Sequence, residues 1–318
     1  MPPDEKEVRL ARVAAIRAVA TDILCYDLSP GDRRPFEPWE PGAHLDVHTP
    51  GGPVRQYSLC GDPRQPTRYT IAVKNEPQSR GGSRSMHGAL EVGAALGISG
   101  PRNHFPLSKS ARRLVFIAGG IGITPIYPMI QAAAAQGREW SLAYCARSEA
   151  HAAFYQDIRR LPGGRVMPHF SEKPTLDAGA MLYEVPQGTH VYCCGPQGLM
   201  RAVADATTHW PGTCVHFEYF SAPAAFWPPN RAFEIELARS GEVLAVPADK
   251  TILQVVREHG IDVHSACEEG VCGTCETRLL GGQAEHRDVL LSPREKELNC
   301  TMMVCVSRAK SPRLVLDL

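Results

Sequence analysis

The chain has 318 residues, of which 43% are hydrophobic and 21% charged, as in ordinary folded proteins and unlike disordered or fibrous ones. Lysine plus arginine and aspartate plus glutamate each total 34, so no overall basic charge favours nucleic acid. No apolar run approaches the roughly 20 residues that cross a bilayer, and the N-terminus lacks a signal peptide, so we expect a cytoplasmic protein without membrane contact. This length exceeds what a single hydrophobic core usually supports, which predicts two or three domains.

Residues 1–106 form the first predicted domain. Short runs that alternate apolar and polar residues occur at 44–48, 69–73 and 96–99, and glycine and proline clusters separate them. Because helical periodicity is scarce between these runs, this part of the chain predicts a small antiparallel β-barrel.

Two segments of this barrel offer groups that suit a planar, phosphorylated ligand. Arg55 and Tyr57 supply a cation and an aromatic ring on one strand, and 80–85 supplies hydroxyls and glycine amides suited to phosphate. Simple packing of Tyr57 and solvation of Arg55 explain the same residues, so the residues alone leave both interpretations open.

The pattern changes after Arg113, and residues 107–222 form the second predicted domain. Short, continuous apolar runs predict buried strands, and the longer segments that connect successive strands predict helices. The predicted strands are 114–118, 141–145 and 190–193, and the predicted helices are 126–135 and 152–161. Strands that alternate with helices indicate an α/β domain with a parallel sheet.

Glycine-rich turns follow two of these strands. The first turn contains Gly120, Gly122 and Thr124, with Pro125 predicted at the first helical position, and its glycines would let a dinucleotide pyrophosphate approach the backbone. The second contains Cys194, Gly195 and Pro196. Both turns should reach the carboxyl edge of the sheet, where a cofactor running from one to the other would bind. A ligand-free turn is common in α/β proteins, and Cys194 is either a packed small residue or a neighbour of the nicotinamide.

Proline-rich residues 223–231 predict a linker, and 232–318 form the third predicted domain. Residues 233–238 and 242–246 indicate a hairpin, and 252–259 indicate a helix. A cysteine-rich loop follows this helix.

Four cysteines near the C-terminus show the spacing of a plant-type 2Fe–2S cluster site, C-x4-C-x2-C with a distant fourth member. They are Cys267, Cys272, Cys275 and Cys305. Gly270 and Gly273 would let the loop wrap around the cluster and direct backbone amides at sulfur. The alternatives are packed thiols or zinc, although zinc usually requires a second C-x2-C pair. Cys300 competes with Cys305 as the fourth ligand.

The other cysteines are scattered. With no export signal in the sequence, reduced thiols are more plausible than a disulfide framework. Five of them are predicted to be packed thiols: Cys25, Cys60, Cys145, Cys193 and Cys214.

These motifs together resemble the phthalate dioxygenase reductase family of the ferredoxin reductase superfamily, which includes vanillate demethylase reductase. The resemblance covers nearly the whole chain. It is carried by Arg55-Gln-Tyr57-Ser58-Leu59, Ala72-Val73-Lys74, Arg80-Gly-Gly-Ser83, Pro101-Arg102-Asn103, the turn ending in Thr124-Pro125, Val191-Tyr-Cys-Cys-Gly-Pro-Gln197, His216-Phe217-Glu218-Tyr219-Phe220 and Met303-Val-Cys305-Val-Ser-Arg-Ala-Lys310.

The resemblance implies FMN rather than FAD, NADH as donor, and a domain order of flavin barrel, nicotinamide domain and α+β β-grasp ferredoxin domain. It places Arg55, Tyr57 and Ser58 on the flavin ring and ribityl chain, and it favours Cys305 as the fourth ligand. Further contacts to the flavin or the nucleotide are implied for Lys74, Gly81, Gly82, Ser83, Thr124 and Phe220.

The expected activity follows from electron counting. NADH gives electrons as a hydride pair, whereas an iron–sulfur cluster accepts one at a time, so a flavin must convert between them. We expect Ser58 to hydrogen-bond near flavin N5 and Cys194 to pack beside the nicotinamide. By the resemblance, the electron acceptor is the Rieske-type oxygenase component of an aromatic-acid dioxygenase or demethylase.

Three alternatives remain open from the sequence. Arg147 could reach the 2′-phosphate of NADPH, or it could cover the adenine of NADH. The partner could be a cytochrome P450, or the protein could be a non-enzymatic iron–sulfur carrier. Glu268 and Glu269 beside the cluster are candidates for pairing with a basic partner.

Overall fold

The computed structural model describes residues 8–32, 34–65, 67–77, 81–171, 176–222 and 227–318. Arg80 and residues 223–226 of the predicted linker lie outside this part of the chain. Two compact units are present, Glu5–Glu218 and a second that contains Tyr219–Leu318, and each is described by itself. None of the helices in the described ranges has the length and apolar character of a membrane span.

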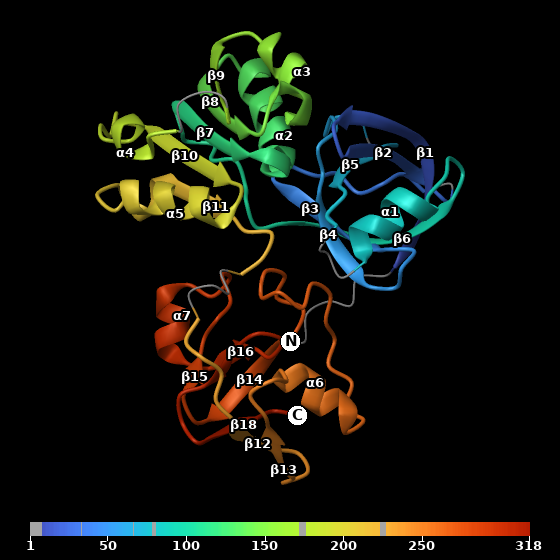
Figure 1. Cartoon of the computed structure of the whole chain (residues 1–318), viewed down its shortest axis with the longest axis vertical. Helices are drawn as coiled ribbons and strands as arrows, with labels where there is room; N and C mark the ends of the chain where they lie inside the picture. The colour runs from blue at the N-terminus through green and yellow to red at the C-terminus, as the bar shows by residue number, and fades with distance from the viewer. Residues whose placement is uncertain (1–7, 33, 66, 78–80, 172–175, 223–226) are drawn as a thin grey trace. The chain divides into compact units, whose positions relative to one another are not determined.

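The first unit begins with six antiparallel strands that curl into a barrel (Figure 1). They are β1 (Arg9–Ala20), β2 (Ile23–Pro30), β3 (Ala43–His48), β4 (Val54–Ser58), β5 (Tyr69–Lys74) and β6 (Ala95–Asn103). The order is β4-β3-β6-β1-β2-β5, and a bridge between Leu59 and Ile71 joins the two ends of the sheet. The predicted antiparallel barrel is therefore present.

Inward-facing side chains fill the barrel. Tyr26, Leu45 and Ile71 are fully buried there, and the Tyr26 hydroxyl donates to the carbonyl of Met86 at 2.9 Å. That carbonyl belongs to helix α1 (Gly82–Ala89), which the sequence analysis did not predict. The helix contains few apolar residues, so its periodicity is weak, and the segment predicted as a phosphate-binding loop is instead the start of a helix.

A five-stranded parallel sheet completes the first unit. Its strands are β7 (Arg113–Gly119), β8 (Glu139–Ala146), β9 (Gly164–Phe170), β10 (Thr189–Cys194) and β11 (Val215–Glu218). The order is β11-β10-β7-β8-β9. From the central strand β7 the chain adds β8 and β9 on one side, and it then crosses over to add β10 and β11 on the other side. The strand order thus reverses between β7 and β10, which is where open α/β sheets bind ligands.

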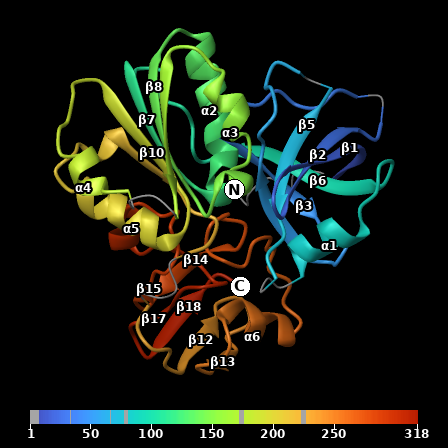
Figure 2. The same ribbon diagram turned by 45° about the horizontal axis from the view of Figure 1, so that its top comes forward.

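Helices cover both faces of this sheet, as Figure 2 shows. On one face lie α2 (Ile123–Ala135) and α3 (Tyr155–Arg159), and on the other lie α4 (Ala178–Met181) and α5 (Gln197–Ala206). Buried residues of α2, α3, β7, β8 and β10 form one core together with Ile23, Cys25 and Cys60 of the barrel.

Two helix predictions need correction. Helix α2 begins at Ile123, so Pro125 occupies its third position rather than its first. Helix α3 is much shorter than the predicted 152–161, because Phe154 adopts a left-handed conformation with φ of 60° and stops the helix from beginning earlier. The ring of Phe154 stacks on Tyr127 with 4.6 Å between centroids, so burial of the ring competes with helix formation.

The second unit contains a five-stranded mixed sheet, a helix against it and a two-stranded ribbon. The main sheet has the order β13-β12-β18-β14-β16, built from β12 (Phe233–Leu237), β13 (Val243–Val246), β14 (Glu276–Gly281), β16 (Thr301–Met303) and β18 (Arg313–Leu316). The ribbon pairs β15 (Ala284–Glu285) with β17 (Arg308–Ala309), and the helices are α6 (Ile252–Glu258) and α7 (Pro293–Leu298). The predicted hairpin and helix are both present.

Candidate functional site

The two glycine turns of the parallel sheet lie against each other at the carboxyl ends of β7 and β10. A Cβ added to Gly122 would lie 2.2 Å from the carbonyl oxygen of Cys194, and one added to Gly119 would lie 2.5 Å from Cδ of Pro196. Only glycine permits this approach. Gly120 has φ of 53°, and its added Cβ would meet nothing within 4 Å. The turns therefore form one continuous backbone surface at the sheet edge.

Cys194 and Glu218 end adjacent parallel strands and are paired in register. Burial raises the pKa of both side chains, that of Glu218 to about 8, and the carboxylate charge raises the pKa of Cys194 further. A carboxyl group that is neutral at pH 7 can donate a hydrogen bond. Glu218 is absent from the predicted site residues, although the motif His216-Phe217-Glu218-Tyr219-Phe220 that carries the family resemblance contains it.

The remaining predicted nucleotide contacts lie along the same edge of the sheet. Thr124 is buried in the first turn of α2, and its hydroxyl donates to the carbonyl of Ile121 at 2.9 Å. Arg147 directly follows β8 and accepts a backbone hydrogen bond from Ser171. The Ser148 hydroxyl is 2.8 Å from His151 Nδ1. Arg147 thus lies one strand away from the glycine turns.

The barrel brings Arg55 to the beginning of α1. A Cβ added to Gly82 would lie 2.9 Å from Cγ of Arg55, so glycine is what allows the arginine side chain to cross this helix end. Gly81 precedes the helix with φ of 96°, a conformation that favours glycine. The positive end of a helix dipole and an adjacent guanidinium both attract an anion, so the site fits a phosphate group.

Tyr57 and Ser58 lie on β4, next to this cation. Ser58 is buried, and desolvation raises the pKa of the partly buried Tyr57 well above its usual range. Lys74 ends β5 and pairs with Glu76 at 2.8 Å, while the Ser83 hydroxyl accepts from the Glu76 amide at 3.2 Å. The structure therefore gathers the predicted flavin residues of the barrel around β4, β5 and α1.

Phe220 differs from the other predicted flavin contacts because it belongs to the second unit. Its side chain is exposed in that unit. Its position beside the flavin stays a prediction.

The four predicted cluster ligands are buried in the second unit, in the loop after α6 and directly after β16. Thiol–thiol hydrogen bonds pair Cys267 with Cys272 and Cys275 with Cys305. These bonds raise the pKa of Cys267 and Cys305, and they lower that of Cys272 to about 6. Among the described residues, no group of three or more metal-ligating side chains takes up a metal-binding geometry.

Hydrogen-bond donors surround these sulfurs. The Glu269 amide donates to Cys267 Sγ at 3.2 Å, and the amide of Gly270 donates to Cys305. Thr274 Oγ1 accepts from the Ala266 amide at 2.9 Å and lies 3.0 Å from Cys272 Sγ, within hydrogen-bond distance of the sulfur. A buried set of thiols with amide and hydroxyl donors fits an iron–sulfur cluster.

Cys300 is exposed, and its thiol donates to the carbonyl of Leu298 at 3.3 Å. Cys305, by contrast, is 3% exposed and contacts Cys275. The environment therefore favours Cys305 as the fourth ligand, in agreement with the family pattern.

Two family models match separate parts of the chain. The family model for the oxidoreductase NAD-binding domain matches residues 116–205, and that for the 2Fe-2S iron-sulfur cluster binding domain matches residues 235–310. Vanillate O-demethylase oxidoreductase of Pseudomonas sp. (strain HR199 / DSM 7063) is 44% identical over 312 residues, 96% of this chain and 98% of that one. Phthalate dioxygenase reductase of Burkholderia cepacia is 41% identical over 322 residues, 100% of this chain and 99% of that one.

Solved structures give the same result. Phthalate dioxygenase reductase, described as a modular structure for electron transfer from pyridine nucleotides to [2Fe-2S], matches with a TM-score of 0.76 and 40% identity, over 100% of both chains. An intact type IV self-sufficient cytochrome P450 monooxygenase matches with a TM-score of 0.84 and 40% identity. That match covers 100% of this chain and 43% of the P450, so this chain spans less than half of that protein.

A dinucleotide-binding sheet and a 2Fe–2S module in one chain define an iron–sulfur oxidoreductase. More narrowly, the chain belongs to the phthalate dioxygenase reductase family, which includes vanillate O-demethylase oxidoreductase. The predicted family, fold class, enzyme class and cofactor set of FMN, 2Fe–2S cluster and NADH are thereby confirmed.

Proposed function

We propose that this protein is the reductase component of a Rieske-type oxygenase system that acts on aromatic compounds. It oxidises NADH through FMN and sends single electrons by way of a 2Fe–2S cluster to a ring dioxygenase or an O-demethylase. The observation that carries this proposal is the end-to-end match with vanillate O-demethylase oxidoreductase and phthalate dioxygenase reductase, which rules out a shared single module as the source of the similarity. The location we propose is cytoplasmic.

The nucleotide site is assigned to the edge where β7 and β10 end. Gly120, Gly122 and Gly195 provide the backbone surface for the pyrophosphate, with Thr124 and Pro196 beside it. Cys194 would flank the nicotinamide, and the neutral Glu218 next to it would donate a hydrogen bond. Exclusion of water by the buried Cys194 and the half-buried Glu218 would protect the hydride donor.

The flavin site is assigned to the barrel. FMN, when bound, accepts electrons as a pair and releases them singly. Arg55 and the amides of Gly81, Gly82 and Ser83 would hold its phosphate. The ring would lie on Tyr57, with the Ser58 hydroxyl near N5, and the resemblance adds Lys74 and Phe220 to these contacts.

The cluster is assigned to Cys267, Cys272, Cys275 and Cys305. The amides of Glu269 and Gly270 and the hydroxyl of Thr274 hold these thiols in place. The domain division proposed with these sites is a flavin barrel at 1–106, a nicotinamide domain at 107–222, a linker at 223–231 and a ferredoxin domain at 232–318.

NADH is the proposed donor, and Arg147 is the residue whose contact with the nucleotide would distinguish NADH from NADPH. On NADH the guanidinium would cover the adenine, whereas NADPH would require it to bind a 2′-phosphate. The Michaelis constants of the two nucleotides, measured with an artificial acceptor, test this assignment. A lower Michaelis constant for NADPH would overturn it.

A cytochrome P450 is a second candidate partner, because the self-sufficient P450 contains a region 40% identical to this whole chain. Reconstitution distinguishes the two partners. The purified reductase should support product formation by a Rieske-type oxygenase and not by a P450 when both are supplied with NADH. A non-enzymatic carrier would instead show cluster absorption without NADH oxidation.

A further inference from the structure

The cysteine loop contains a residue other than glycine with left-handed backbone geometry. Glu268, which follows the ligand Cys267, has φ of 55°. Such a conformation is unfavourable for a residue with a β-carbon, so neighbouring contacts must hold it. The feature lies next to the cluster site, where backbone orientation decides which amides face sulfur.

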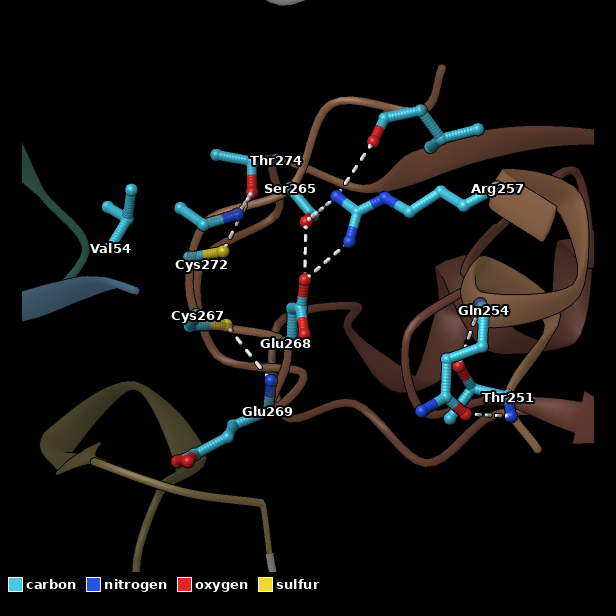
Figure 3. A network of polar contacts seen from close by, with 12 residues as sticks. Val54, Thr251, Gln254, Arg257, Ser265, Cys267, Glu268, Glu269, Cys272 and Thr274 are labelled. Atoms are coloured by element: carbon cyan, nitrogen blue, oxygen red, sulfur yellow. Dashed lines mark hydrogen bonds and ion pairs between the residues drawn. The ribbon is translucent and has the colours of Figure 1, made fainter. Parts of the chain in front are cut away.

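Arg257, in the last turn of α6, holds Glu268 in place (Figure 3). Its Nη1 donates to Glu268 Oε1 at 2.7 Å, and the Ser265 hydroxyl donates to the same oxygen at 3.0 Å. Arg257 Nη2 also donates to Ser265 Oγ and to the carbonyl of Val263, so the guanidinium binds three points of the loop. We call Arg257, Ser265 and Glu268 the loop clamp.

The helix that carries Arg257 is itself fixed. Its residues Ile252, Leu253, Val255 and Val256 are buried, and a capping box between Thr251 and Gln254 secures its first turn (Figure 3). The side chains of Arg257 and Glu268 are 41% and 38% exposed. Ion pairs with this exposure contribute little to stability, so the clamp is better explained by its effect on the loop.

The effect reaches a cluster ligand through one peptide unit. The amide of Glu269, directly after Glu268, donates to Cys267 Sγ at 3.2 Å (Figure 3). The direction of that amide depends on the backbone angles of Glu268. Hydrogen bonds to sulfur stabilise the reduced cluster, which carries more negative charge, and so raise its reduction potential.

We propose that Arg257 is a positioning residue that raises the reduction potential of the 2Fe–2S cluster by holding Glu268 in its left-handed conformation. The proposal rests on the proposed cluster site. It also corrects the sequence-based expectation for Glu268. That carboxylate is engaged within the chain rather than available to a basic partner protein.

The first test is the midpoint potential of the cluster in the purified full-length protein, measured by an anaerobic titration followed by electron paramagnetic resonance. Arg257→Gln should lower the equilibrium constant for cluster reduction three- to tenfold, where tenfold is 59 mV for one electron. Lys250→Gln is the matched control. It removes one positive charge, as Arg257→Gln does, and it breaks an exposed ion pair with Glu258, the last residue of α6. The control should keep the wild-type potential.

Two double variants separate geometry from charge. Arg257→Gln with Glu268→Gln removes both charges but leaves a side chain that resists the left-handed conformation, so its potential should stay low. Arg257→Gln with Glu268→Gly removes the same charges and the backbone cost, so its potential should return to that of the wild type. If Arg257→Gln prevents cluster assembly, the same contrast is expected in iron content.

Equal potentials, or equal iron contents, in the two double variants would overturn the proposal, as would a wild-type potential in Arg257→Gln. A wild-type protein without iron would instead refute the proposed function. The two failures are therefore distinguishable.

Discussion

Several residues at the candidate sites are buried where an apolar side chain would pack at lower cost. The four cluster thiols are at most 5% exposed, and the half-buried Glu218 ends a strand of the parallel sheet. Burying polar groups costs free energy unless partners compensate for it, so such clusters mark functional positions. Spacing alone identified the thiols in the sequence. Glu218 was missed because a single acidic residue has no spacing to compare.

The cluster assignment predicts different results for two cysteines in the same unit. Cys272→Ser should abolish the paramagnetic signal of the reduced cluster and lower the iron content, because a buried hydroxyl is a poor ligand for iron. Cys300→Ser should leave both unchanged, since that thiol is exposed. Metal analysis and electron paramagnetic resonance measure these outcomes. Loss of the cluster in Cys300→Ser would overturn the choice of Cys305.

The half-buried carboxyl of Glu218 predicts a pH dependence. Burial raises its pKa from 4.5 to about 8, so the folded chain keeps a proton that the unfolded chain has lost between these values. This contribution to stability is complete below about pH 4.5 and disappears as the pH rises through about 8, with a slope of at most about 1.4 kcal/mol per pH unit.

Thermal unfolding between pH 5.5 and 9 tests this interpretation. The Glu218→Gln variant cannot ionise, so its melting temperature should fall less with rising pH than that of the wild type. Identical slopes in the two proteins would show that Glu218 does not titrate as its burial requires.

At the scale of elements, the sequence predicted strands and helices with a clear apolar pattern, and it missed those with a weak one. The runs around Leu114 and Ile252 gave the strand β7 and the helix α6 nearly as the structure has them. Helix α1 was missed because residues Gly82–Ala89 have few apolar positions, and its stability comes from contacts such as Tyr26 with Met86. Tertiary contacts of this kind leave no regular pattern in the sequence.

The contact between the two glycine turns predicts that they tolerate no side chain. Gly122→Ala should destabilise the protein by about 2–3 kcal/mol, because its Cβ would overlap the carbonyl of Cys194. It should also raise the Michaelis constant for NADH about tenfold, which corresponds to about 1.4 kcal/mol of binding. Gly198→Ala, in the first turn of α5, is the control.

The control position has open space around it, since an added Cβ meets nothing within 4 Å. Alanine there should stabilise the helix by up to about 1 kcal/mol and leave the Michaelis constant unchanged. Unfolding by urea and steady-state kinetics measure both effects. A wild-type Michaelis constant in Gly122→Ala would contradict a cofactor that spans the two turns.

The start of α1 predicts where the flavin phosphate binds. Arg55→Gln should weaken FMN binding by about 10- to 100-fold, because a charge-assisted hydrogen bond is worth about 1.5–3 kcal/mol. Arg64→Gln is the control, since its side chain is 82% exposed and pairs with Asp62 on the same barrel. Fluorescence titration of the apoprotein with FMN distinguishes them. Equal affinities in the two variants would move the phosphate away from Arg55.

At the scale of the whole molecule, the described end of the predicted linker, residues 227–231, is attached to the second unit more firmly than its prolines suggest. The guanidinium of Arg287 lies 5.2 Å above the ring of Trp227 and donates to Asn230 Oδ1 at 2.7 Å. Arg308 donates to the carbonyl of Arg231 at 2.9 Å. Proline clustering predicted a linker here, but it carried no information about these buried arginines. The end of the predicted linker is therefore part of the ferredoxin-like unit.

The central claim is that one chain takes electrons from NADH and delivers them to its own iron–sulfur cluster. An anaerobic titration of the purified protein with NADH, followed by absorption and electron paramagnetic resonance, tests it most directly. We expect bound flavin and iron, bleaching of both absorptions and the signal of a reduced 2Fe–2S cluster. Zinc in place of iron, or a cluster that stays oxidised while NADH reduces the flavin, would contradict it.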